Sequence, residues 1–143
     1  MSDFRTFEDK PTDRDSGPTI LIADDDEVNR DRFRNILSSS EFASKIHILE
    51  SSDIPSTLAI LSSTPVHVLL LDKHFSADTS DPTTNGIDHI AEFLGLQPHL
   101  QILVITASNV VKDIVRAMKD GAQNYVLKEE EDALILQHVE KEV

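Results

Sequence analysis

The chain has 143 residues, with 13 basic and 26 acidic side chains, a formal net charge of −13 and no cysteine. This charge repels nucleic acid phosphates and anionic lipid, so we expect this domain to bind neither nucleic acid nor a membrane surface. The length allows one hydrophobic core, and the lack of cysteine excludes disulfides, thiolate metal sites and a cysteine nucleophile.

The first 17 residues mix charged side chains with Pro, Ser and Gly and show no apolar periodicity. They are expected to be a disordered leader that precedes one folded domain over residues 18–143. The Met1 end is polar and the longest apolar runs are only as long as a strand, so neither a signal peptide nor a membrane span is expected. The predicted localisation is cytoplasmic.

Short apolar runs rich in Val, Ile and Leu alternate with amphipathic segments along the rest of the chain. Five runs have the length and composition of strands, namely residues 19–23, 45–49, 66–71, 101–106 and 123–127. The third and fourth runs lack strict polar alternation, which indicates strands covered on both faces.

The segments that follow these runs carry helix signals. The predicted helices cover residues 27–39, 53–63, 86–96, 109–121 and 131–142. In the fourth of them, Ser108 or Asn109 can cap the start and Gly121 suits a left-handed stop. Its apolar residues recur on one face, and they are Val110, Val111, Ile114, Val115 and Met118.

Five strands that are each followed by a helix imply parallel pairing with right-handed crossovers. The predicted fold is α/β, a doubly wound sheet of five parallel strands in the order 2-1-3-4-5, with helices on both faces in a flavodoxin-like three-layer sandwich. Ligands of such sheets bind beyond the carboxyl ends of the strands.

Polar side chains stand at four of those strand ends: Asp24–Asp26, Asp72, Thr106 and Lys128. Carboxylates that meet there repel one another unless a positive charge lies between them. Mg²⁺ prefers oxygen ligands, needs only one or two carboxylates and leaves room for a phosphoryl oxygen. An aspartate beside it can act as a nucleophile toward phosphorus, while a lysine and a hydroxyl neutralise the developing charge. The sequence therefore predicts a magnesium-assisted phosphoryl-transfer site.

The chain also resembles a known family, the receiver domain of two-component response regulators (CheY-like phosphoacceptor domains). The resemblance spans about residues 18–143. It is carried by five motifs in order: ILIADDDEVNR from Ile20, LLLD ending at Asp72, NGIDHI from Asn85, VITAS from Val104 and DGAQNYVLK ending at Lys128.

The resemblance implies that Asp72 accepts a phosphoryl group from a sensor histidine kinase or a histidine phosphotransfer protein in a phosphorelay. Asp24 and Asp25 look like the acidic pair that binds Mg²⁺, together with Asp72 and the backbone carbonyl of His74. We treat the His74 side chain as a group that controls the access of water to the phosphoryl group.

The family pattern also implies switch and output functions. Thr106 looks like the switch hydroxyl and Tyr125 like the aromatic that moves with it, while Lys128 looks like the cation that contacts the phosphoryl oxygen. The surface of the fourth helix, fifth strand and fifth helix would then contact a downstream effector, an attached output domain or a second copy of the chain. Such a domain is a signalling phosphoprotein rather than an enzyme, beyond slow self-phosphorylation from small donors and self-dephosphorylation.

Three features depart from the family pattern. Residues 73–85 form a longer loop than usual, and Asp78 and Asp81 within it are expected to be solvated or to cap turns. Glu129 follows Lys128 where the family usually has a proline in a cis peptide bond, so either the turn differs or strain is stored there. The chain ends with the fifth helix and no output domain follows, which fits a single-domain regulator or an excised receiver.

Two other functions are compatible with parts of the pattern. Residues 24–28 fit a D-x-D-x-V motif, which resembles haloacid-dehalogenase-like phosphatases with Asp24 as nucleophile, although Asp72 is then unexplained. A receiver-like module that binds proteins without phosphorylation is the other alternative. The aspartates at 24–26 also suit a plain helix N-terminus, and Tyr125 suits a core position.

Overall fold

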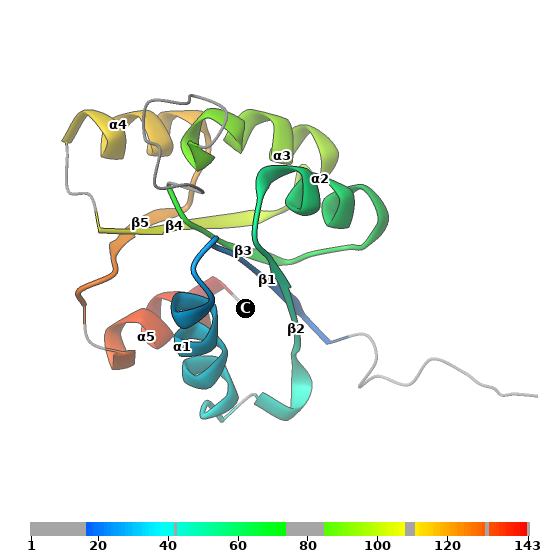
Figure 1. Cartoon of the computed structure of the whole chain (residues 1–143), viewed down its shortest axis with the longest axis vertical. Coiled ribbons are helices and arrows are strands. Elements are labelled where there is room, and N and C mark those ends of the chain that lie inside the picture. The colour runs from blue at the N-terminus through cyan, green and yellow to red at the C-terminus, as the bar shows by residue number, and fades with distance from the viewer. Residues whose placement is uncertain (1–16, 42, 74–84, 108–110, 131, 143) are drawn as a thin grey trace, which may run out of the picture.

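The computed structural model of the chain describes residues 17–41, 43–73, 85–107, 111–130 and 132–142. These residues form a five-stranded parallel sheet with helices on both of its faces (Figure 1). The strands are β1 (Thr19–Ala23), β2 (His47–Ser51), β3 (Val68–Leu71), β4 (Gln101–Thr106) and β5 (Asn124–Leu127). Their order is β2-β1-β3-β4-β5, which confirms the predicted doubly wound fold.

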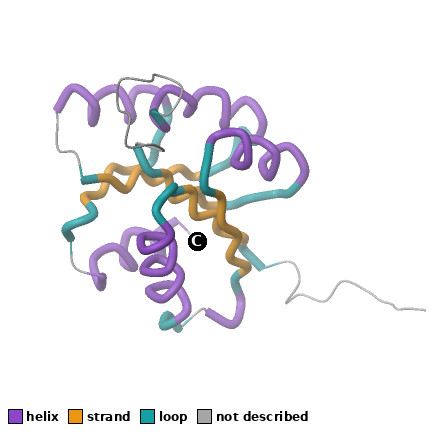
Figure 2. Tube along the Cα trace, viewed as in Figure 1, coloured by secondary structure: helices purple, strands orange, loops and turns teal. Residues whose placement is uncertain are grey.

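The helices separate into two layers, as the tube in Figure 2 shows. The α-helices are α1 (Glu27–Ser38), α2 (Ile54–Ser63), α3 (Ile90–Leu96), α4 (Val111–Asp120) and α5 (Asp132–Glu142), and two 3₁₀ helices are η2 (Ala43–Lys45) and η4 (Gly86–His89). Helices α1 and α5 share one buried apolar cluster with the sheet, and α2, α3 and α4 share the other. Among the described helices, none combines the length and the apolar character needed to cross a bilayer.

The central strands β1 and β3 are buried on both faces because each side of the sheet carries a helical layer. Adjacent residues of β1 point into opposite clusters, since Leu21 joins the α2–α3–α4 side and Ile22 joins the α1–α5 side. The prediction of strands covered on both faces is confirmed for β3 and β4.

The predicted boundaries are right for both ends of β1 and β4, and several other ends differ by a few residues. The predicted starts of the fourth and fifth helices, at residues 109 and 131, lie outside the described residues. The second strand begins at His47, not at residue 45, because the 3₁₀ turn η2 includes Lys45. The third helix begins as the 3₁₀ helix η4, whose start is capped by the Asn85 side chain, and becomes α-helical at Ile90.

Helix α4 ends as predicted, with Gly121 at φ +117° in the left-handed region. Its apolar face, however, is largely turned to solvent: Val111, Val115 and Met118 are exposed, and Ala117 is the buried residue of the helix. The caps considered at residues 108 and 109, the apolar Val110 and the leader up to residue 16 lie outside the described residues.

Ion pairs attach α4 to the rest of the domain. Lys73 Nζ lies 2.7 Å from Asp113 Oδ2 in the first turn of the helix. Arg116 in the middle of the helix pairs with Asp88 of η4. Charged contacts therefore supplement the small apolar contact that Ala117 makes with the core.

Candidate functional site

The site lies at the carboxyl ends of β1 and β3, which are neighbours in the sheet. Asp24 follows β1 and Asp72 follows β3, and the Asp72 amide donates to the Ala23 carbonyl at 2.9 Å. This bond extends the ladder between the two strands by one step and brings the two aspartates together. Both are buried, with 2% of Asp24 and 6% of Asp72 exposed.

Asp25 completes a cluster of three carboxylates. One oxygen each from Asp24, Asp25 and Asp72 lies within 4.8 Å of the others, and Asp25 is the exposed member. The sheet and the short connection to α1 thus bring together the three acidic side chains that the sequence predicted as metal ligands. His74, predicted to add its backbone carbonyl, lies outside the described residues, as do Asp78 and Asp81.

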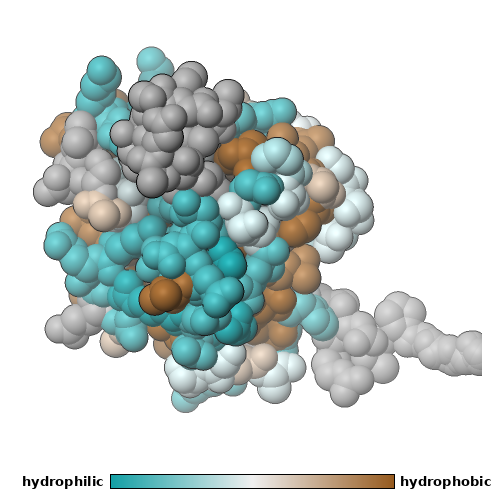
Figure 3. All heavy atoms as spheres, in the orientation of Figure 1, coloured by the Kyte–Doolittle hydropathy of each residue, from teal (hydrophilic) through white to brown (hydrophobic). Residues whose placement is uncertain are grey.

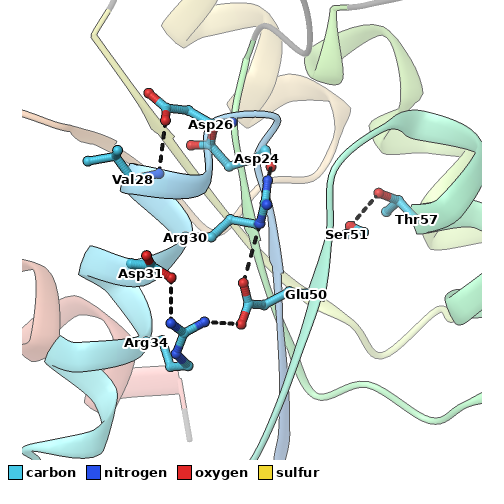
Figure 4. Close-up of polar contacts among 9 residues, drawn as sticks. All are labelled: Asp24, Asp26, Val28, Arg30, Asp31, Arg34, Glu50, Ser51 and Thr57. Carbon is cyan, nitrogen blue, oxygen red and sulfur yellow. Dashed lines mark hydrogen bonds and ion pairs between the residues drawn. The ribbon is translucent and has the colours of Figure 1, made fainter.

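The third aspartate of the run has a structural task. Asp26 is the N-cap of α1, and its Oδ1 accepts a 2.9 Å hydrogen bond from the Val28 amide (Figure 4). Its own amide donates to Asp24 Oδ1 at 2.9 Å. The helix-start interpretation is therefore right for Asp26, which in turn orients the Asp24 carboxylate.

Lys128 supplies positive charge to the two buried acids. Its Nζ lies 3.1 Å from Asp72 Oδ1 and 3.0 Å from Asp24 Oδ2. Its amide donates to the Thr106 carbonyl at 2.8 Å, which fixes the end of β5 against the end of β4. The described residues contain no cis peptide bond, so the turn after Lys128 differs from the family pattern.

Thr106 and Tyr125 lie on the same side of the sheet. Thr106 is the last residue of β4 and is 2% exposed. Tyr125 pairs with Val104 in the register between β4 and β5, and it packs against the apolar cluster under α2, α3 and α4. Because side chains alternate along a strand, Thr106 points to the same face as Val104 and Tyr125.

Burial dominates the electrostatics of Asp72. Loss of solvent and the neighbouring Asp24 raise its pKa to about 7, although Lys128 opposes the shift. Partial burial, followed by the charge of Asp24, also raises the pKa of Asp25. For Lys128, burial alone would lower the pKa, but the charges of Asp72 and Asp24 together outweigh it and raise the pKa.

The donor set fits a hard divalent cation. Asp24 Oδ2 is buried and, among the described residues, accepts no hydrogen bond, although the Lys128 ammonium is close to it. A buried carboxylate oxygen is costly without a positive partner. The Lys128 ammonium is one such partner for Asp24 Oδ2, and a metal ion can be a second. Three carboxylate oxygens within 4.8 Å of one another match the preference of Mg²⁺ for oxygen ligands.

Several residues that shape the site were not predicted from the sequence. Arg30 donates to the Asp24 carbonyl at 2.8 Å, and Arg32 donates to the Lys128 carbonyl at 2.7 Å. Gly86 lies so close to Asp72 that a Cβ there would overlap the Asp72 carbonyl oxygen. For Arg30 and Arg32, the sequence signal is a predicted helix with three arginines in a strongly acidic chain.

Comparisons with known proteins agree with this geometry. The family profile of the response regulator receiver domain matches residues 20–140. The transcriptional regulatory protein FixJ of Rhizobium meliloti is 28% identical over 123 residues, which are 86% of this chain and 55% of FixJ. The alginate biosynthesis transcriptional regulatory protein AlgB of Pseudomonas aeruginosa is 27% identical over 109 residues, which are 76% of this chain and 22% of AlgB. The chain thus spans about half or less of the length of these two relatives.

A solved structure adds evidence on the fold. A response regulator from Burkholderia pseudomallei, described with a phosphorylated aspartic acid, a calcium ion and citrate, superposes with a TM-score of 0.70 at 24% identity. The match covers 87% of this chain and 72% of that one. At this identity the similarity establishes the shared fold alone.

The chain belongs to the response regulator receiver domain family of two-component systems. Receiver domains are signalling domains that bind Mg²⁺ at an acidic pocket and interact with histidine kinases and effector domains. In this chain Asp24, Asp25 and Asp72 form a cluster of three carboxylates that could hold a metal ion.

Proposed function

We propose that this domain accepts a phosphoryl group on Asp72 from a histidine kinase or a histidine phosphotransfer protein, and that it signals by a change of conformation. The observation that carries the proposal is the place of Asp72. It is buried at a strand end, shares a cluster with two further carboxylates and contacts an ammonium group.

In the proposed step, an Asp72 carboxylate oxygen attacks the phosphorus atom of a phosphohistidine. The new P–O bond forms as the P–N bond breaks, and its electron pair stays on the imidazole nitrogen of the donor. Lys128 neutralises the transferred oxygens because its ammonium already lies beside Asp72. Thr106 is proposed to donate its hydroxyl to the same group from the end of β4.

Asp24, Asp25 and Asp72 are the proposed Mg²⁺ ligands, together with the backbone carbonyl of His74. The ion supplies positive charge that offsets the repulsion between the carboxylates and the phosphoryl group. Asp26 orients Asp24 by donating its amide to Asp24 Oδ1. Asp26 is thus a supporting residue in this proposal rather than a ligand.

The proposed output surface is formed by α4, β5 and α5. Tyr125 on β5 is the proposed aromatic switch. The exposed side chains Val111, Val115 and Met118 give α4 an apolar surface that suits contact with an effector, an attached output domain or a second copy of the chain.

The test is labelling by a small acyl phosphate in the presence of MgCl₂, followed by intact mass spectrometry. The wild type should gain the mass of one phosphoryl group, and Asp72→Asn should gain none. Asp26→Asn is the matched control, because it alters a neighbouring carboxylate of the same run and should keep most of the labelling. Labelling of Asp72→Asn at the wild-type rate would contradict the assignment.

A protein-binding module that needs no phosphorylation is the second candidate, and the exposed apolar residues of α4 favour it. It predicts that beryllium fluoride with Mg²⁺ leaves the NMR spectrum unchanged, whereas a working receiver should show shifts around Asp72. The phosphatase alternative has less support. It assigns no task to Asp72, and it predicts labelling of Asp24 with steady turnover of phosphate esters.

A further inference from the structure

The guanidinium of Arg32 on α1 donates hydrogen bonds to the segment that joins β5 to α5. Arg32 Nη1 donates to the Lys128 carbonyl at 2.7 Å, and Nη2 donates to the Glu130 carbonyl at 3.0 Å. Arg32 Nε donates to Asp132 Oδ1 at 3.0 Å. Arg32 lies about 100 positions earlier in the chain, and it thus binds two residues of the turn, Lys128 and Glu130, and the first residue of α5, Asp132.

Both peptide groups of Lys128 are held as a result. Its amide donates to the Thr106 carbonyl at 2.8 Å, and its carbonyl accepts from Arg32 at 2.7 Å. The ammonium is at the end of a long, flexible side chain. Its position therefore depends on the direction in which the Lys128 side chain leaves the backbone. Fixing the peptide on both sides directs Nζ toward Asp72 and Asp24, which it reaches at 3.1 and 3.0 Å.

The neighbouring arginines on α1 point to the other side of the helix. Arg30 donates to the Asp24 carbonyl at 2.8 Å and pairs with Glu50 of β2 at 3.3 Å (Figure 4). Arg34 pairs with Glu50 and Asp31. The visible surface over α1 is accordingly mostly hydrophilic (Figure 3). Arg34 is thus a natural control, with the same charge, on the same helix and in ion pairs of its own.

We propose that Arg32 is a positioning residue for the phosphoryl-binding cation, which acts by fixing the Lys128 backbone so that the ammonium faces Asp72. This inference rests on the proposed function of Asp72. It assigns to α1 a task beyond packing, since the helix holds the backbone of a site residue on each side: Asp24 through Arg30 and Lys128 through Arg32.

The planar fork of arginine suits this task better than lysine would. It donates to two carbonyls at once while a third N–H reaches a carboxylate, whereas an ammonium is a point charge. Arg32→Lys should therefore retain the attraction to Asp132 and lose the paired carbonyl bonds. We expect this variant to position Lys128 better than Arg32→Ala and less well than the wild type.

The test uses the affinity of the whole chain for beryllium fluoride with saturating Mg²⁺, since this ligand mimics the phosphoryl group on Asp72. Arg32→Ala should weaken binding by roughly tenfold, because one charge-assisted contact is partly lost. Arg32→Lys should weaken it by less, and Arg34→Ala should stay within about twofold of the wild type. Circular dichroism of each variant checks folding, and if Arg32→Ala does not fold, Arg32→Lys carries the comparison.

A double-mutant cycle with Lys128→Met separates positioning from general support of the fold. If Arg32 acts through Lys128, Arg32→Ala should cause no further loss of affinity when Lys128 is already replaced. An unchanged affinity of Arg32→Ala, or an equal loss in both backgrounds, would overturn the inference. A wild type that fails to bind beryllium fluoride with Mg²⁺ would contradict the proposed function itself, and this inference with it.

Discussion

Lys128 and Asp72 are 56 positions apart in the chain, yet the Lys128 ammonium donates a 3.1 Å hydrogen bond to Asp72 Oδ1. The same ammonium lies 3.0 Å from Asp24 Oδ2, so one partly buried cation contacts two buried carboxylates. The site therefore holds more negative than positive charge. Its protonation and metal binding should respond to any change in this balance.

The first prediction concerns the stability of Asp72→Asn without metal. The folded state raises the pKa of Asp72 from 3.8 to about 7, so it binds this proton more tightly than the unfolded chain does. The wild type should therefore lose stability as the pH rises from about 4 to about 7. At pH 8 in EDTA, Asp72→Asn should be more stable by roughly 2 kcal/mol, and the difference should shrink toward pH 5.

Urea unfolding followed by circular dichroism measures this difference. Saturating Mg²⁺ should reduce or reverse it, since the ion stabilises the state that binds it. Asp26→Asn serves as the control, and it should be less stable than the wild type because the cap of α1 is altered. A variant at position 72 that is less stable than the wild type at pH 8 in EDTA would contradict the prediction.

The second prediction is a pH-dependent affinity for Mg²⁺. Below about pH 7 the ion has to displace the proton from Asp72, so the affinity should rise with pH and level off above this value. Calorimetry in two buffers of different ionisation enthalpy should detect the released proton. Asp72→Asn should show no such release, and equal wild-type affinities at pH 6 and pH 8 would count against Asp72 as a ligand.

The third prediction concerns Lys128→Met, which removes the ammonium and keeps an apolar stem. The charge and hydrogen bond of Lys128 lower the pKa of Asp72, so their loss should raise this pKa above about 7. Carbon-13 NMR of the Asp72 carboxyl during a pH titration measures the midpoint. Lys119→Met, at an exposed position of α4, is the control that should leave the midpoint in place.

The fourth prediction compares two glycines of the η4–α3 segment. A Cβ at Gly86 would overlap the Asp72 carbonyl oxygen, so Gly86→Ala should destabilise the domain by about 1–3 kcal/mol and weaken Mg²⁺ binding. A Cβ at Gly95 in α3 meets nothing within 4 Å, so Gly95→Ala should stabilise the domain by about 0.5–1 kcal/mol. Denaturant midpoints of the two variants that shift in the same direction would refute this contrast.

The pattern of apolar residues in the sequence predicts much of the fold. β1 and β4 lie where their uninterrupted apolar runs predicted, because strands buried on both faces need such runs. The edge strand β2 carries a weaker pattern, and both of its ends lie two residues later than this pattern predicts. Periodicity also located the apolar face of α4 without revealing that Val111 and Val115 point to solvent, since a pattern in one helix does not state what packs against it.

The candidate site was predictable to the extent that strand ends define it. Asp24, Asp25, Asp72 and Lys128 converge because the carboxyl ends of parallel strands lie on one edge of the sheet. The contacts of Arg32 were not predictable, because a side chain that bonds to backbone carbonyls about 100 positions away leaves no local pattern.

Lys73 is the residue directly after Asp72, and it is nearly as buried. Its ammonium reaches Asp113 in the first turn of α4, a helix that otherwise buries a single alanine. The peptide bond between Asp72 and Lys73 and the ion pair between Lys73 and Asp113 thus connect the proposed acceptor aspartate to this helix. A displacement of the peptide after Asp72 would therefore act on α4 through the ion pair between Lys73 and Asp113.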